Sequence, residues 1–89
     1  MTWDYRITRE RITDPDGTEA HLFACREVYY DAEGNVAVWS EKPVTFVGDT
    51  PGEVADSLAR AAGCLSRGVL DLATRETVHV ALDGSEAIR

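Results

Sequence analysis

Apolar and polar residues alternate on both sides of a turn sequence between residues 27 and 43. The segment Asp31-Ala32-Glu33-Gly34 suits a type I turn followed by a left-handed glycine, which predicts a β-hairpin. Strand pairing across this turn gives each face of the hairpin its own set of side chains. One face is expected to pair Tyr30 with Val36 and Val28 with Val38. The opposite face is expected to carry Glu27, Tyr29, Ala37, Trp39 and Glu41.

The same alternation predicts a strand from Trp3 to Arg11. The alternation stops at Arg9 and Arg11, so we interpret this end of the strand as an exposed edge. Residues 14–17, Asp-Pro-Asp-Gly, are a strong turn signal. A second strand is expected over residues 20–30 and a third over residues 35–42. Consecutive strands joined by tight turns favour an antiparallel meander.

A helix is predicted after the sheet residues. Thr50 can cap it, Pro51 suits its first position, and Glu53 completes a capping box. A left-handed Gly68 is expected to end it. Apolar residues recur at helical spacing and are expected to pack on the sheet. They are Val54, Leu58, Ala61 and Leu65.

The predicted fold class is therefore α+β, in one domain that spans residues 1–89. We expect an antiparallel sheet of three or four strands with one amphipathic helix on one face. Residues 69–72 are expected to pack back on the core, and the alternation over residues 77–82 leaves a further C-terminal strand open. One helix covers one face, so the other is expected to be an interface unless the C-terminal segment covers it.

Composition narrows the function classes. The formal net charge is −7, and the 16 acidic residues are scattered along the chain. An acidic chain disfavours direct contact with nucleic acid or an anionic membrane surface. Neither a membrane-spanning apolar run nor the layout of a signal peptide occurs, so a cytoplasmic location is expected.

Candidate chemistry is sparse. His21 and His79 lie far apart and no Cys-x-x-Cys occurs, so neither a metal nor a cofactor is expected. No nucleophile elbow or phosphate loop is present, which predicts a protein that is not an enzyme. Cys25 and Cys64 are expected to stay reduced, and they can meet only if the helix end reaches the second strand. The arginines of the first two strands are interpreted as solvated residues that balance nearby glutamates: Arg6, Arg9, Arg11 and Arg26.

Two motifs carry a resemblance. Trp-x-Tyr-Arg-Ile at residues 3–7 and Glu-Val-Tyr-Tyr-Asp-x-x-Gly at residues 27–34 resemble a family of small uncharacterised bacterial proteins. Trp39-Ser40-x-x-Pro43 and the helix start agree with it, and the chain departs from it after Leu70. The resemblance implies a shared fold, and it implies no activity or site residue.

Three functions remain open. The first is a protein-interaction module, homodimeric or bound to another protein, with an exposed aromatic sheet face. Its candidate residues are Phe23, Glu27, Tyr29, Trp39 and Glu41. The second is an inhibitor of phage or mobile-element type, which blocks a nucleic-acid-handling complex with an acidic surface as a DNA mimic or anti-CRISPR protein does; its candidates are Asp49, Glu53 and Asp56. The third, ranked last, is an enzyme or a ligand-binding domain with a pocket between helix and sheet.

Overall fold

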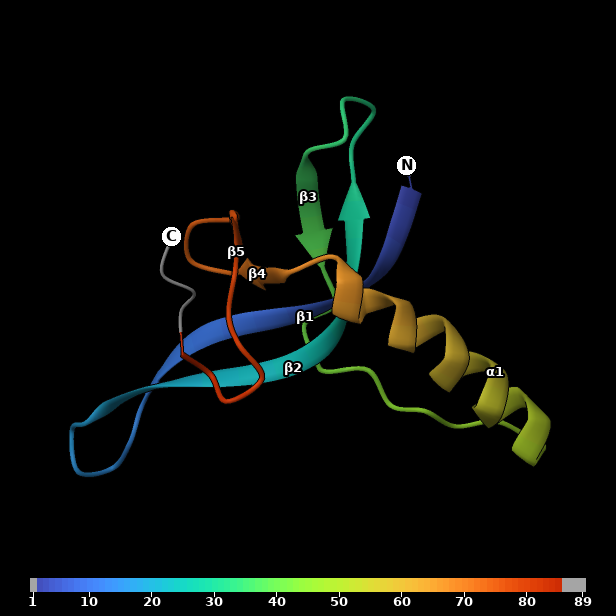
Figure 1. Ribbon diagram of the computed structural model, residues 1–89, viewed down its shortest axis with the longest axis horizontal. Helices are drawn as coiled ribbons and strands as arrows, with labels where there is room; N and C mark the ends of the chain where they lie inside the picture. Colours follow the sequence, from blue (N-terminus) through green and yellow to red (C-terminus); the bar gives the residue numbers. More distant parts are fainter. Residues whose placement is uncertain (1, 86–89) are drawn as a thin grey trace.

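The computed structural model describes residues 2–85 and shows a five-stranded sheet with one α-helix (Figure 1). The elements in chain order are β1 (Thr2–Thr13), β2 (Glu19–Tyr30), β3 (Val36–Trp39), α1 (Pro51–Ala62), the 3₁₀ helix η1 (Gly63–Ser66), β4 (Val69–Asp71) and β5 (Thr77–Val78). The strand order in the sheet is β3-β2-β1-β4-β5. The predicted α+β class and the meander of the first three strands are therefore confirmed.

The sheet is mixed, however, and the expectation of a purely antiparallel sheet is wrong. β4 lies parallel to β1, with Ile7 beside Val69 and Arg9 beside Asp71. Parallel neighbours need a long connection, and the chain makes it through β2, β3 and α1 before it returns to the free side of β1. β5 then adds antiparallel to β4, and it is shorter than the alternation over residues 77–82 suggested.

The hairpin β2–β3 contains a bulge that changes its register. Tyr30 faces Val36 as predicted, but Val28 faces Trp39 and not Val38. The register shifts between Tyr29 and Tyr30, which leaves one extra residue on β3. Because successive side chains point to opposite faces, one extra residue moves Trp39 to the face of Val28. The prediction that Trp39 shares a face with Tyr29 is therefore wrong.

The β1–β2 register defines two faces of the sheet. The helix face carries Trp3, Tyr5, Ile7, Arg9 and Arg11 of β1 with His21, Phe23, Cys25, Glu27 and Tyr29 of β2. The arginine face carries Asp4, Arg6, Thr8 and Glu10 with Leu22, Ala24, Arg26, Val28 and Tyr30. The helix face takes its name from α1 and η1, because Arg60 of α1 lies over the Trp3 ring and Cys64 of η1 interacts with Cys25.

The buried apolar residues come from β2, the end of α1, η1 and β4. They are Val28, Ala61, Cys64, Val69 and Leu70. Leu70 and Val28 are fully buried, with exposed fractions of 0%. The core is small, because only the C-terminal end of α1 comes close to the sheet while the rest of the helix extends away from it (Figure 1).

The start of α1 follows the prediction, but its packing does not. The Thr50 hydroxyl accepts from the Glu53 amide at 3.2 Å, and the Glu53 carboxylate accepts from the Thr50 amide, which forms the capping box. Of the predicted apolar stripe, only Ala61 is buried, whereas Leu58 and Leu65 are 51% and 66% exposed. The α-helix ends at Ala62 and continues as η1, and Gly68 has the left-handed φ of 74° beyond it.

Candidate interaction surface

Four aromatic residues gather on the helix face. Trp3 meets Tyr5 edge-on with ring centroids 5.2 Å apart, and Tyr29 lies 6.3 Å from Trp3. Phe46, from the segment before α1, lies 6.3 Å from Tyr5. The guanidinium of Arg60 lies 5.2 Å from the Trp3 ring centroid, in cation–π geometry. These contacts satisfy much of the aromatic surface within the chain, so this group is a small second core as well as a surface.

The five interface candidates from the sequence do not form one surface. Phe23, Glu27 and Tyr29 share the helix face, so the expectation that the interface candidates lie on the sheet face opposite the helix is wrong for these three. The Tyr29 hydroxyl donates to Glu27 at 3.5 Å. Trp39 lies on the arginine face, with the Arg75 guanidinium 5.2 Å from its ring centroid. Glu41 is exposed beyond the end of β3, and its carbonyl oxygen accepts from the Arg26 side chain at 2.8 Å. The bulge in β3 separates the set.

The acidic candidates lie around the start of α1, and Glu53 is the one that caps it. Asp49, Glu53 and Asp56 are all exposed at the start of the helix. Glu53 accepts from the backbone amides of Asp49 and Thr50, so its charge stabilises the helix N-terminus. Of the three, only Glu53 lies in the first helical turn, where a carboxylate has this local role in many proteins.

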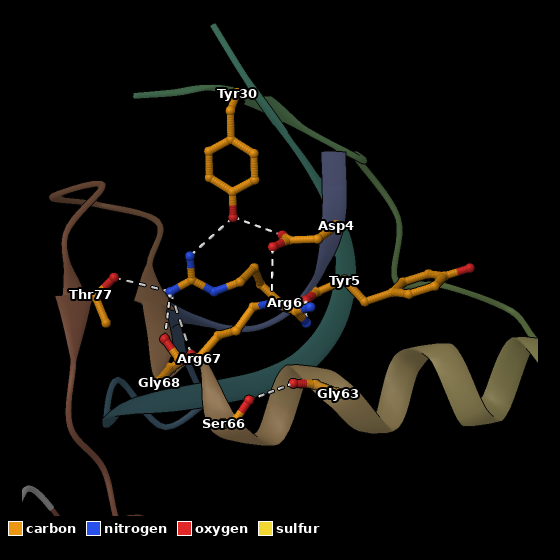
Figure 2. A network of polar contacts seen from close by, with 9 residues as sticks. All are labelled: Asp4, Tyr5, Arg6, Tyr30, Gly63, Ser66, Arg67, Gly68 and Thr77. Carbon is orange, nitrogen blue, oxygen red and sulfur yellow. Dashed lines mark hydrogen bonds and ion pairs between the residues drawn. The ribbon is translucent and has the colours of Figure 1, made fainter. Parts of the chain in front are cut away.

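The arginine face holds a polar network around Arg6 (Figure 2). Arg6 donates to the Tyr30 hydroxyl at 3.1 Å, and that hydroxyl donates to Asp4 at 2.7 Å. The other terminal nitrogen of the Arg6 guanidinium donates to the Arg67 carbonyl at 3.2 Å and to the Thr77 hydroxyl at 3.0 Å. Burial raises the pKa of Tyr30. The hydrogen bond from Arg6 lowers this pKa and the hydrogen bond to Asp4 raises it, and the net shift is upward. Arg6 thus joins β1 to the chain on both sides of β4.

Two further buried arginines also hold strands together. Arg26 donates to the Thr8 hydroxyl at 3.0 Å and pairs with Glu10 at 3.0 Å. Arg9 pairs with Asp71 at 2.7 Å across the parallel β1–β4 contact. The interpretation of Arg6, Arg9 and Arg26 as solvated residues is therefore wrong, while Arg11 is exposed. Local sequence patterns do not indicate this burial, because the carbonyls and the aspartate that bind these side chains come from distant segments.

An apolar hollow of about 580 Å³ lies on the helix face, between the sheet, η1 and the turn at residues 81–84. Ile7, Phe23 and Val69 line it from the sheet, and Cys64 and Leu65 from η1. Burial, and then the neighbouring Cys64 thiol, raise the pKa of Cys25. A raised pKa keeps this thiol protonated and unreactive. The two cysteines therefore lie next to each other, which the sequence had left open.

Within residues 2–85, no three His, Cys, Asp or Glu side chains gather as metal ligands would. In the same part of the chain, no helix has the length and apolar character to cross a membrane.

Another exposed part of the sheet is the arm, by which we mean residues 10–23 of the β1–β2 hairpin. β4 pairs only with Ile7–Arg9, so the arm continues beyond it as two strands alone (Figure 1). Leu22 on the arginine face is 44% exposed, and Phe23 on the helix face is 38% exposed. A two-stranded ribbon with apolar residues on both faces is marginally stable in water, so the arm is the strongest candidate for a contact surface.

Comparison of the chain with protein-family models, with curated proteins and with solved structures finds no match. The fold and the exposed surfaces are therefore the basis of the functional argument.

Proposed function

We propose that this protein is a small non-enzymatic protein-interaction module that binds a second copy of itself. The observation that carries the proposal is the surface that one chain leaves uncovered. The accessible surface is 6380 Å², whereas a compact monomer of this mass exposes about 5,200 Å². The difference exceeds the roughly 800 Å² that each partner buries in a standard interface.

The shape of the chain supports the same proposal. Its radius of gyration is 14.4 Å, against about 12 Å for a compact domain of this length. The excess comes from elements that extend away from the core, namely the arm and α1 (Figure 1). The arm exposes Leu22 and Phe23, α1 exposes Leu58, and η1 after it exposes Leu65. Burying such residues in a dimer recovers hydrophobic free energy that one chain alone does not gain.

The test is sedimentation velocity and native mass spectrometry over a range of micromolar concentrations. We expect a peak at twice the chain mass, with the dimer fraction rising with concentration. A monomer at every concentration overturns the proposal.

A pair of matched variants locates the contact. Phe23→Gln on the arm is compared with Val47→Gln, because Val47 is 73% exposed outside the sheet. We expect Phe23→Gln to raise the dimer Kd roughly tenfold, since it removes buried apolar surface, and Val47→Gln to leave it unchanged. Equal effects of the two substitutions would mean that the arm has no special part in association.

A further inference from the structure

We infer that two copies join edge to edge through β2, with residues 19–23 of one copy paired antiparallel to residues 19–23 of the other around a two-fold axis at His21. This inference rests on the proposed function and specifies its geometry. The paired strands make one continuous sheet across the dimer, as strand addition does in other assemblies.

The first support is a set of unused backbone groups. In β2 the Cys25 carbonyl accepts from the Val44 amide, and the Glu27 carbonyl accepts from the Ser40 amide. Both carbonyls therefore point away from β1. Backbone groups alternate along a strand, so the amides and carbonyls of Glu19, His21 and Phe23 point outward in the same way. Within residues 2–85 nothing hydrogen-bonds to these outward groups. They form an open edge that can pair with another strand.

The second support is the length and symmetry of this edge. It is bounded by the turn after residue 18 and by the Val44 amide bond to Cys25. Centring the two-fold axis on His21 pairs Glu19 with Phe23 of the other copy, and His21 with its own equivalent. These three pairs use outward groups only, and they form about six inter-chain hydrogen bonds. The outward backbone groups of the two copies therefore hydrogen-bond to each other without any change in the monomer.

The third support is the side chains that this register brings together. Residues directly opposite each other share a face, so Leu22 of one copy lies against Ala20 of the other on the arginine face. Ile12 is the neighbour of Ala20 on β1, which extends the apolar strip. On the helix face, Phe23 covers the stem of Glu19 from the other copy. The arrangement covers exposed apolar side chains on both faces of the arm.

This geometry also fixes the direction of the two helix faces. A two-fold axis perpendicular to the sheet keeps like faces on the same side, so both helix faces look in one direction. The Trp3–Tyr29 aromatic groups and the two hollows are then presented together, to one side of the joined sheet.

The experiment compares two proline variants at the same level of the arm. His21 and Arg11 face each other across β1 and β2, and both have outward amides, since the Arg9 carbonyl points outward to accept from Leu72. Proline is tolerated at outward positions of edge strands. We expect His21→Pro to raise the dimer Kd roughly 10- to 100-fold while the circular dichroism spectrum stays unchanged. We expect Arg11→Pro to leave the dimer Kd unchanged.

A second measurement reads the register directly in the wild-type protein. In an equal mixture of isotope-labelled and unlabelled chains, we expect an inter-chain nuclear Overhauser effect between the α-protons of Ala20 and Leu22, which form a close non-hydrogen-bonded pair. A dimer without this contact, or a dimer that survives His21→Pro, overturns the edge geometry and leaves self-association standing. A wild-type monomer overturns both proposals. If His21→Pro does not fold, or if both variants are monomeric, the inter-chain contact decides.

Discussion

The two halves of the β1–β2 hairpin differ in burial although they share the same strands and one continuous register. In the central half, Thr8, Arg26 and Val28 are buried. There β4 lies beside β1, and the Arg26 side chain donates to the carbonyls of Ser40 and Glu41 after β3. In the arm, Leu22 and Phe23 remain exposed. The pairing between the strands is equally regular in both halves, so the difference comes from the neighbours. A hairpin alone does not make a core, and the third and fourth strands decide which part of it does.

The largest test of this contrast is a pair of leucine truncations. Leu70 in β4 is fully buried against β1, whereas Leu22 in the arm is 44% exposed. We expect Leu70→Ala to lower the free energy of unfolding by about 2–5 kcal/mol and Leu22→Ala by about 1 kcal/mol or less. Urea denaturation at a fixed protein concentration measures both. Equal losses would mean that the arm belongs to the core.

The Arg9–Asp71 ion pair, where the central half ends, gives a test that depends on pH. Burial by itself raises the pKa of Asp71, but the hydrogen bond from Arg9 and the amides of Thr74 and Ala73 outweigh it, so the pKa is lowered. A lowered pKa means that the carboxylate contributes stability at neutral pH. This contribution is lost as the pH falls from about 5 through the lowered pKa.

Asp71→Asn isolates the ion pair, because the amide oxygen can still accept from Ala73 and Thr74 while the Arg9 bond is lost. We expect a loss of about 1.5–3 kcal/mol at pH 7. The gap between wild type and variant should close on acidification, as followed by urea denaturation at a series of pH values. A gap that stays constant with pH would contradict the role given to the carboxylate.

The smallest expected effect comes from alanine substitutions in the two hairpin turns. Gly17 at the tip of the arm and Gly34 in the β2–β3 turn have φ of 87° and 85°, and added Cβ atoms would meet nothing within 4 Å at either. Alanine therefore costs about 1 kcal/mol of backbone strain at each turn. We expect Gly34→Ala to lower the global free energy of unfolding by this amount. Gly17→Ala should lower it less and speed amide exchange in the arm, because the arm opens locally.

Local signals in the sequence predicted the local elements well. The turns at residues 14–17 and 31–34 are where the chain turns, and α1 begins at Pro51 behind the predicted capping box. Each depends on residues within a few positions of one another, so a sequence pattern can report them. The bulge in β3 could not be predicted this way, since an alternation of apolar residues fits either register.

The candidate surface was predicted less well for the same reason. Trp39 was assigned to the wrong face by one residue of register, and the exposure of Leu22 was not anticipated. The apolar spacing of α1 predicted a packed helix, but spacing says only which side chains share a face. Whether that face meets another element depends on the connection after Ala62, which leads the chain away into β4.

The sequence alone therefore determined the three-strand meander, its turns, the helix start and the α+β class, because short-range sterics, capping and alternation act within each segment. Only the tertiary structure decided that β4 lies parallel to β1, that Arg6, Arg9 and Arg26 are buried, and that the arm has a free edge. These features depend on which distant segments become neighbours. That choice is made by the whole chain as it buries apolar surface and pairs its buried charges.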